Sequence, residues 1–192
     1  LLAEVVARVS GKPFSDFLAE RIFQPLGMND TRVVDVPGTV RKNMAYAYGL
    51  EGDVYVERPV NGALTGSTGV YSTVEDLCRW AMNFRTPIVG DRAMLDRMER
   101  SGVLSNGQSF TYGLGLDHKD HRGQHVVFHG GGLAGYRAYL VRVPEHRLVI
   151  AIASNAEDFN PIETAEKAID LFLAEEIGAW EAGQAKVKRP AR

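Results

Sequence analysis

The sequence predicts an α+β fold, in which an antiparallel β-sheet is flanked by helices. Amphipathic helical patterns occur before residue 100, strand-like runs separated by tight turns follow from residue 110, and a further helical pattern comes near the end of the chain. The chain has 192 residues, of which 45% are hydrophobic and 24% are charged. This composition is typical of a folded globular protein, and the length is sufficient to bury a sizeable core.

Two amphipathic helices are expected at the start of the chain. Apolar residues at helical spacing predict the first over residues 1–9, with Gly11 closing it. The second begins at Pro13, and Pro25 and Gly27 end it. The apolar face of this second helix consists of Phe14, Phe17, Leu18 and Ile22.

A loop-rich excursion is expected over residues 28–70, because Gly, Pro and Asn are scattered through it, with short strands near 44–50 and 54–58. The Ser-Thr-Val-Glu sequence that follows predicts a capping box at the start of a helix. In this box the Ser72 hydroxyl accepts a hydrogen bond from the amide of the third residue after it, and Glu75 reaches back to the amide of Ser72.

The helix after this cap is expected to bury one apolar stripe, formed by Val74, Leu77, Cys78, Ala81 and Met82. Because an unpaired cysteine is usually buried and inert, Cys78 is interpreted as a small core side chain and not as a nucleophile. A further helix over residues 91–100 has Asp91 as its cap. Its inward residues are Met94, Leu95 and Met98.

From residue 110 the pattern changes to strands and hairpins. Strands are predicted over 112–116, 124–129, 136–143 and 148–153, with a polar hairpin at 118–123 and a tight turn at 144–146. The last of these strands is continuously apolar, which indicates that both faces of the sheet are covered. One cover is a final helix, whose inward residues are Ile162, Ala165, Ile169 and Phe172.

Charge and composition exclude several classes of function. The formal net charge of -2 provides no basic surface to attract a phosphate backbone, so we expect no nucleic-acid partner. The single cysteine excludes an internal disulfide and any multi-cysteine zinc site. No apolar run approaches the roughly 20 residues of a membrane-spanning helix, so no transmembrane segment is expected.

The segment HGGGLAGY at residues 129–136 is the most unusual part of the sequence, and it lies between two predicted strands. Consecutive glycines let another backbone or a ligand approach closely. Exposed amides on such a segment can also point at a developing oxyanion. The alternative is a glycine-rich hairpin with a bulge and an incidental histidine, and the segment alone leaves both interpretations open.

Other residues suggest two other kinds of site. His118, His121, His125 and His129 suggest metal ligands by their spacing, but in a strand His125 and His129 stand roughly 13 Å apart, so no metal is predicted. A Ser-His-Asp hydrolase of another fold is also disfavoured, because the Gly-Ser-Thr-Gly loop at residues 66–69 does not match Gly-x-Ser-x-Gly.

Four sequence blocks, in order, carry a resemblance to a known family. They are LLAEVVARVSGKPFSDFLAERIFQPLGM, GSTGVYSTVEDLCRWA, YGLGL and FHGGGLAGYRAYLVRVPEHRLVIAIASNAE. Together they resemble the serine β-lactamase-related family, which includes class C β-lactamases, D-alanyl-D-alanine carboxypeptidases, D-aminopeptidases and family VIII esterases. The resemblance implies the C-terminal portion of the β-lactamase/transpeptidase-like fold. We expect a partial domain over residues 1–178, followed by a basic tail over 179–192.

The resemblance also implies a set of site residues. His129-Gly130-Gly131 matches the Lys-Thr-Gly or His-x-Gly triplet on the strand that edges the family's active site. His129 would then orient or polarise the substrate, and the amide of Gly132 would be one oxyanion-hole donor. The substrate-binding residues would be Gly130, Gly131, Gly135 and Tyr136. The loop at 66–69 is interpreted as structural, and no metal or organic cofactor is implied.

The family's nucleophile and base are not found in this sequence. The family uses Ser-x-x-Lys, in which the lysine one helical turn after the serine takes its proton, and none of the serines here is followed by lysine at that position. The Tyr-x-Asn or Ser-x-Asn motif, which stands just ahead of the first helix in family members, is not found either. We therefore expect the C-terminal part of a hydrolase that cleaves amide or ester bonds and is inactive alone.

Apolar surface should be exposed where the missing segment packs. The expected partners are a small-molecule or peptide substrate, and either the N-terminal segment or a second copy of the chain. The alternative is a non-catalytic ligand-binding or interaction domain derived from this fold. The residues leave open the compartment and the choice among β-lactam, D-amino-acid peptide and ester substrates.

Overall fold

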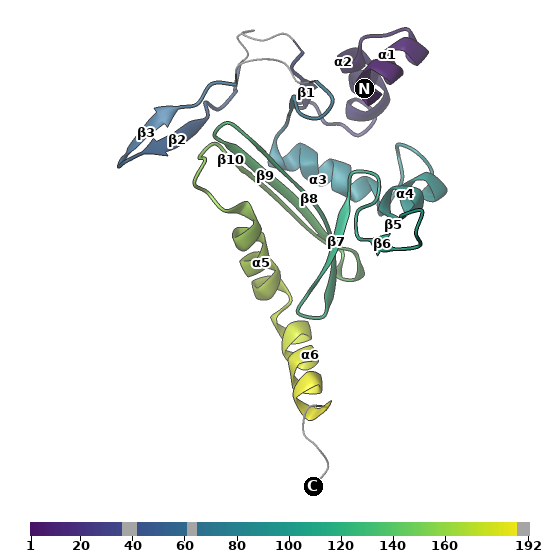
Figure 1. The fold of residues 1–192 in the computed structure, drawn as a ribbon, viewed down its shortest axis with the longest axis vertical. Helices are drawn as coiled ribbons and strands as arrows, with labels where there is room; N and C mark the ends of the chain where they lie inside the picture. Colours follow the sequence, from purple (N-terminus) through teal and green to yellow (C-terminus); the bar gives the residue numbers. More distant parts are fainter. Residues whose placement is uncertain (36–41, 61–64, 188–192) are drawn as a thin grey trace.

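An antiparallel four-stranded sheet forms the centre of the chain (Figure 1). In this computed structural model, which describes residues 1–35, 42–60 and 65–187, the strands lie in the order β10, β9, β8, β7. Their bounds are Asp117–His121 for β7, Gln124–Leu133 for β8, Tyr136–Val143 for β9 and Leu148–Ser154 for β10. Together with the flanking helices, this sheet confirms the predicted α+β class.

Tight turns set the register of these strands. Arg122 and Gly123 have φ values of 52° and 82°, as a two-residue type I′ turn requires, and His121 therefore pairs with Gln124. The polar hairpin predicted here is confirmed. A 3-10 turn over Pro144–His146 joins β9 to β10, at the position where a tight turn was expected.

Helices cover both faces of the sheet, as the apolar β10 predicted (Figure 1). Helix α5, Pro161–Phe172, lies on one face, and α3, Val74–Asn83, lies on the other. The α5 face holds the largest core cluster, formed by Val126, Tyr139, Val141, Val143, Ala165, Ile169, Leu173 and Ile177. The prediction for α5 is confirmed at Ala165 and Ile169 but wrong at Ile162 and Phe172, which are exposed in the first and last turns of the helix.

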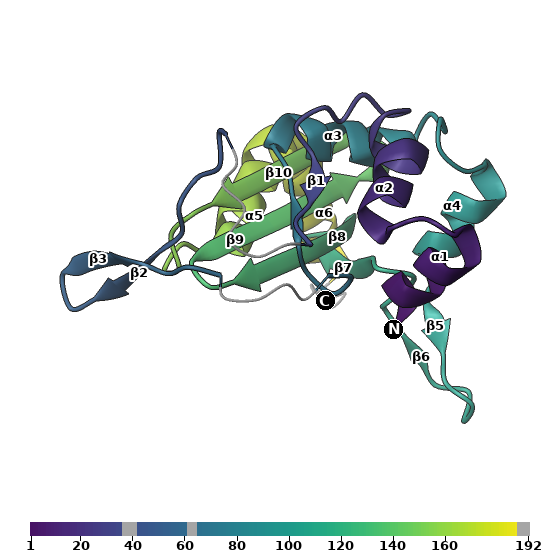
Figure 2. The ribbon, with the colours of Figure 1, turned by 90° about the horizontal axis from the view of Figure 1, so that it is seen from above.

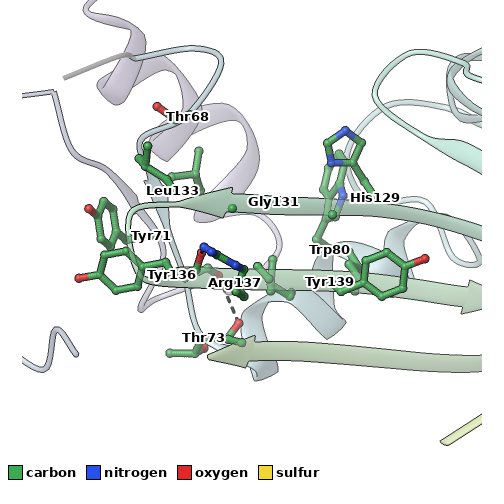
Figure 3. A pocket seen from close by; sticks show the side chains of 18 of the residues that line it. Thr68, Tyr71, Thr73, Trp80, His129, Gly131, Leu133, Tyr136, Arg137 and Tyr139 are labelled. Atoms are coloured by element: carbon green, nitrogen blue, oxygen red, sulfur yellow. Dashed lines mark hydrogen bonds between the residues drawn. The ribbon is translucent and has the colours of Figure 1, made fainter. Parts of the chain in front are cut away.

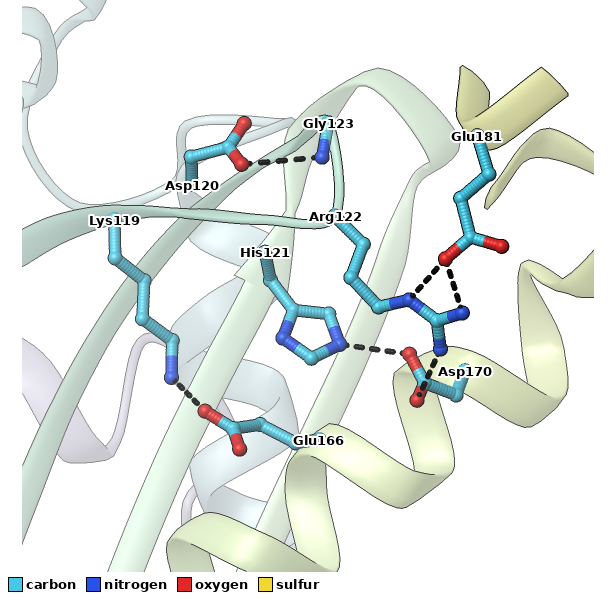
Figure 4. A network of polar contacts seen from close by, with 8 residues as sticks. All are labelled: Lys119, Asp120, His121, Arg122, Gly123, Glu166, Asp170 and Glu181. Atoms are coloured by element: carbon cyan, nitrogen blue, oxygen red, sulfur yellow. Dashed lines mark hydrogen bonds and ion pairs between the residues drawn. The ribbon is translucent and has the colours of Figure 1, made fainter. Parts of the chain in front are cut away.

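A row of charged contacts also joins the sheet to the C-terminal helices (Figure 4). Lys119 contacts Glu166 at 2.6 Å, and His121 contacts Asp170 at 2.7 Å. The Arg122 guanidinium donates to Asp170 at 2.7 Å and also reaches a glutamate on α6, Ala174–Val187. The β7–β8 hairpin is thus held against α5 and α6 by charge as well as by apolar burial.

Helix α6 lies largely in residues 179–192, the segment that the sequence predicts to be a basic tail. The helix continues to Val187, and residues 188–192 of the expected tail lie outside the described residues. None of the helices in the described ranges has the length and apolar character that a membrane-spanning helix requires.

Helix α1, Leu2–Ser10, opens the chain, and Gly11 closes it, as predicted; the φ of Gly11 is 68°, in the left-handed region. Helix α2, Phe14–Leu18, continues into a π-helical turn, η1, over Ala19–Phe23. A second core cluster gathers behind them, formed by Phe23, Leu26, Met28 and Val33. The outer face of α1 stays exposed and apolar, at Leu2, Val5 and Val9.

The predicted capping box at α3 is displaced by one residue. Thr73, not Ser72, is the N-cap, and its hydroxyl accepts a hydrogen bond from the amide of Asp76 at 3.2 Å. The Ser72 hydroxyl instead contacts the hydroxyl of Thr31 at 2.7 Å, and Thr31 also donates to the buried Asp76 carboxylate. A partner distant in sequence therefore takes the hydroxyl that local spacing assigned to the cap. Within α3, Ala81 is buried as predicted, whereas Met82 is exposed.

The prediction for α4, Arg92–Glu99, is largely confirmed. Asp91 caps it by accepting from the Met94 amide at 2.7 Å, and Leu95 is fully buried. The Met94 side chain is exposed, contrary to expectation.

Short ladders complete the described part of the fold. They pair β1 Arg32–Val33 with β4 Val70–Tyr71, β2 Tyr48–Glu51 with β3 Val54–Glu57, and β5 Gly102–Val103 with β6 Ser109–Phe110. The β2–β3 and β5–β6 hairpins project from opposite sides of the molecule (Figure 2). The strand predicted over 112–116 is wrong, because Gly115 has a φ of 82° and the segment bonds back to the end of α4.

Candidate active site

A cavity of about 750 Å³ lies against the second half of β8, between the sheet, α3 and the loop at residues 66–69 (Figure 3). The cavity brings together most of the site residues predicted from the sequence, namely His129, Gly130, Gly131, Gly132 and Tyr136. Gly135 is not part of its lining. Apolar walls come from Leu77, Trp80 and Ala81 of α3.

The stretch of β8 at this cavity has one unpaired edge. Strand β7 pairs only with residues 124–128 of β8, whereas β9 pairs with residues 127–133. The glycines therefore continue the strand, and the predicted strand end at residue 129 is wrong by four residues. Backbone groups on the free edge of such a strand are available to a ligand.

The register of the β8–β9 hairpin indicates which amides face this edge. Its two-residue turn joins Leu133 to Tyr136, which makes these two a hydrogen-bonded pair. In an antiparallel ladder the hydrogen-bonded pairs then recur at every second residue. By that alternation the N–H and C=O groups of Gly130 and Gly132 point away from β9, toward the unpaired edge.

The glycines differ in the room around them. A Cβ added at Gly131 would have no atom within 4 Å, so the space beside this residue is open. A Cβ at Gly130 would lie 3.1 Å from the Tyr139 ring, and a Cβ at Gly132 would lie 3.5 Å from the guanidinium of Arg137. The absence of a side chain at Gly131 therefore leaves room in the cavity and serves no internal packing need.

His129 lies on the cavity side of the sheet, on the same face of β8 as Val127. The hydroxyl of Tyr112 lies 2.9 Å from Nε2 of His129, and the two rings meet edge to face with centroids 5.9 Å apart. Tyr112 belongs to the YGLGL block, but no feature of the sequence predicts a role for it. A contact between an irregular loop and a strand leaves no periodic signal that could have revealed it.

Tyr136 closes one end of the cavity. Its hydroxyl donates to the carbonyl of Ala45 at 2.7 Å, and its ring meets that of Tyr71 edge to face at 5.7 Å. Burial raises the pKa of Tyr136, which keeps its hydroxyl protonated. Gly135 serves packing instead, because a Cβ there would collide with the backbone of Tyr48 in β2.

The loop at residues 66–69 lines the cavity opposite the strand. Gly66 and Gly69 have φ values of 112° and 93°, which side chains rarely adopt. The loop is tied down by the amide of Val34, which donates to the carbonyl of Gly69 at 2.7 Å. These features fit the structural role expected for it.

The histidines whose spacing suggested a metal site contact different partners. His118 contacts His125 at 3.1 Å, His121 contacts Asp170 on the α5 face, and His129 contacts Tyr112. No group of three or more His, Cys, Asp or Glu side chains within residues 1–35, 42–60 and 65–187 is arranged to hold a metal ion. Cys78 is half-buried, and its burial raises the pKa of its thiol, which disfavours the nucleophilic thiolate.

Comparisons with known proteins extend over nearly the whole chain. A family model described as Beta-lactamase matches residues 1–175. Penicillin-binding protein 4* of Bacillus subtilis is 29% identical over 180 residues, which cover 86% of this chain and 40% of that protein. The D-alanyl-D-alanine-carboxypeptidase/endopeptidase AmpH of Escherichia coli K12 is 30% identical over 165 residues, which cover 77% of this chain and 41% of AmpH.

A D-aminopeptidase of Gluconobacter oxydans is 27% identical over 187 residues, which cover 93% of this chain and 33% of that enzyme. This chain thus spans less than half the length of the curated relatives it matches.

Solved structures show the same architecture. An octameric penicillin-binding protein homologue from Pyrococcus abyssi superposes with a TM-score of 0.78 at 27% identity, covering 90% of this chain and 40% of that one. A D-amino acid amidase from Ochrobactrum anthropi superposes with a TM-score of 0.67 at 24% identity, covering 80% and 47%. These likenesses confirm the penicillin-binding-protein/β-lactamase fold that the sequence predicted.

Proposed function

Because this chain belongs to the beta-lactamase family, we propose that it forms one wall of the active site of a serine hydrolase that cleaves amide bonds through an acyl-enzyme. One observation carries the proposal: the unpaired edge of β8 runs along the cavity, with the amides of Gly130 and Gly132 directed to that edge. An extended substrate can lie beside such an edge as an additional strand.

In this proposal each site residue has a distinct task. The amide of Gly132 donates to the oxyanion that forms when the substrate carbonyl is attacked, and the loss of one such donor typically costs about 10²–10³ in rate. His129 orients or polarises the substrate beside it. Gly130 and Gly131 leave room for the substrate backbone, and Tyr136 borders the pocket.

The proposed substrate class is a peptide or amide of a D-amino acid. Two of the relatives, a D-aminopeptidase and a D-alanyl-D-alanine-carboxypeptidase/endopeptidase, act by their names on bonds next to D-residues. β-Lactams and small esters present a similar carbonyl to the same groups, and they are the competing substrate classes.

The nucleophile and its base are proposed to come from outside these 192 residues. Three serines of this chain line the cavity, at positions 67, 72 and 154, and none of them is followed three residues later by lysine. The Ser72 hydroxyl contacts Thr31, and the Ser154 hydroxyl accepts from the amide of Ala156. Neither contact provides a base that could take the hydroxyl proton.

Ligand binding tests whether the unpaired edge of β8 binds substrate. Titration of the isotope-labelled chain with D-alanyl-D-alanine should shift the amide resonances of Gly130 and Gly132, whereas L-alanyl-L-alanine should have a smaller effect. Gly131→Val should abolish the shifts by filling the open space beside the strand. Gly178→Val is the matched control, because a Cβ on this α6 glycine also meets no atom within 4 Å. Shifts that are absent, or that survive Gly131→Val, would contradict the proposed site.

Activity assays test the proposal that the nucleophile lies outside this chain. The isolated chain should not turn over a chromogenic β-lactam, the p-nitroanilide of D-alanine or p-nitrophenyl butyrate above the rate of heat-denatured chain. A fluorophosphonate probe should label none of its serines, as judged by mass spectrometry. Turnover that is abolished by His129→Ala, together with a labelled serine, would show that this chain carries its own nucleophile.

A further inference from the structure

We propose that Tyr112 is a positioning residue that fixes the ring orientation and the tautomer of His129. The proposed function gives the reason why His129 must be oriented, and in that respect the inference rests on it. The contact between Tyr112 and His129 is a feature of this chain and does not depend on the function. The Tyr112 hydroxyl lies 2.9 Å from Nε2 of His129, and the rings meet at 62°. Tyr112 is the one side chain that hydrogen-bonds His129 within the described ranges.

The backbone around Tyr112 is held firmly enough to serve as a reference point. Its carbonyl accepts from the amide of Gly102 at 3.0 Å, and the next residues bond to the end of α4 through Leu114, which donates to the carbonyl of Met98 at 2.8 Å. A Cβ on Gly113 would collide with that same carbonyl oxygen. The tyrosine is therefore anchored to α4, on an element that does not belong to the sheet.

His129, by contrast, has little else to hold its ring. The imidazole is exposed, and the next three residues along β8 are glycines that offer no side chain to pack against it. An exposed histidine without such a contact would sample several rotamers and both neutral tautomers. A group that must present one nitrogen to a substrate requires a fixed ring and a fixed proton.

The chemistry of the pair favours one tautomer. A neutral imidazole has one N–H donor and one acceptor nitrogen, and a phenol is a better donor than acceptor. With the Tyr112 hydroxyl donating to Nε2, the proton of His129 stays on Nδ1. Nδ1 then becomes the nitrogen that can donate to a carbonyl or carboxylate in the cavity.

Thr111, the residue before Tyr112, makes a contact of its own. A hydrogen bond from the Thr111 side chain lowers the pKa of Asp117, and the charge of His129 acts in the same direction. The adjacent Thr111 and Tyr112 thus reach two different groups, the Asp117 carboxylate and the His129 imidazole. The segment that carries Tyr112 is therefore held by a second side-chain contact.

Long-range ¹⁵N–¹H correlation spectra of the unliganded chain test the proposal directly, at about pH 8.5 where imidazoles are largely neutral. The His129 ring signals are assigned with His129→Asn. In the unchanged chain His129 should be mainly the Nδ1–H form. In Tyr112→Phe, which keeps the ring and its packing, it should shift to the Nε2–H form that a solvated imidazole prefers. Tyr55→Phe, on the projecting β3, is the control and should change nothing.

An Nε2–H form in the unchanged chain, or an Nδ1–H form that survives Tyr112→Phe, would overturn the proposal. An unaltered amide spectrum outside residues 112 and 129 confirms that the variant is folded, and Tyr112→Leu provides a second variant that lacks the hydroxyl. The measurement needs neither substrate nor turnover. Its outcome is therefore independent of whether the chain binds D-alanyl-D-alanine.

Discussion

The two halves of β8 have different roles, although they form one continuous strand. We call residues 124–128 the core half and residues 129–133 the glycine half. Residues 124–128 are paired with β7, and the last two of them also with β9; they send Val126 into the α5 core and Val127 into the cluster against α4. Residues 129–133 are paired only with β9 and carry three glycines beside a cavity. Side chains in the first half stabilise the fold, and their absence in the second half leaves room for a ligand. The strand therefore links a rigid core directly to the proposed site.

A pair of alanine substitutions should separate the two halves most strongly. Val126→Ala removes two buried methyl groups from a fully buried position and should lower the free energy of unfolding by about 2–3 kcal/mol, from lost burial plus the cavity left behind. Gly131→Ala, five residues along the same strand, should change it by less than about 0.5 kcal/mol, because its Cβ meets open space. Urea denaturation followed by circular dichroism measures both. Equal losses would mean that the glycine half is packed as tightly as the core half.

The same division explains what the sequence could predict. Strand β9 was predicted with its observed bounds, because its alternation and the flanking turns are local signals. The glycines of β8 carry no such alternation, so the predicted strand stopped at residue 129. The segment at 112–116 mimics an alternating strand but is bent by Gly115 and bonded to α4. Local patterns therefore located the core half well and the site half less well.

Contacts between distant residues account for the remaining differences. The predicted capping box is displaced by one residue because the Ser72 hydroxyl contacts Thr31, which lies 41 residues away in the chain. The contact between Tyr112 and His129 likewise joins two segments that no periodicity relates. The family resemblance predicted His129 and Gly132 as site residues, because they belong to or follow the family's triplet. The contact of Tyr112 with His129 could be found only in the structure.

Charged contacts also hold the β7–β8 turn, at which the core half of β8 begins (Figure 4). A substitution of Asp170 measures how much these contacts contribute to the stability. Burial alone would raise the pKa of the Asp170 carboxyl, but hydrogen bonds from His121 and Arg122 outweigh it and lower the pKa below its ordinary value. A depressed pKa contributes stability above the ordinary value of about 4, and this stability is lost as the pH falls through the lowered pKa. Asp170→Asn should therefore be less stable at pH 7, by at most about 1 kcal/mol for a partly exposed contact.

The pH dependence distinguishes this charge effect from lost packing. As the pH falls below about 4, the carboxyl in the unchanged chain takes up its proton, so the stability difference between it and Asp170→Asn should shrink. Asp53→Asn, in the exposed turn between β2 and β3, should match the unchanged chain at every pH within about 0.5 kcal/mol. A deficit of Asp170→Asn that stays constant from pH 7 to pH 3 would assign the role of Asp170 to packing. Asp170 would then hold the β7–β8 hairpin against α5 by packing, and at this contact the difference from the glycine half would be one of side-chain volume.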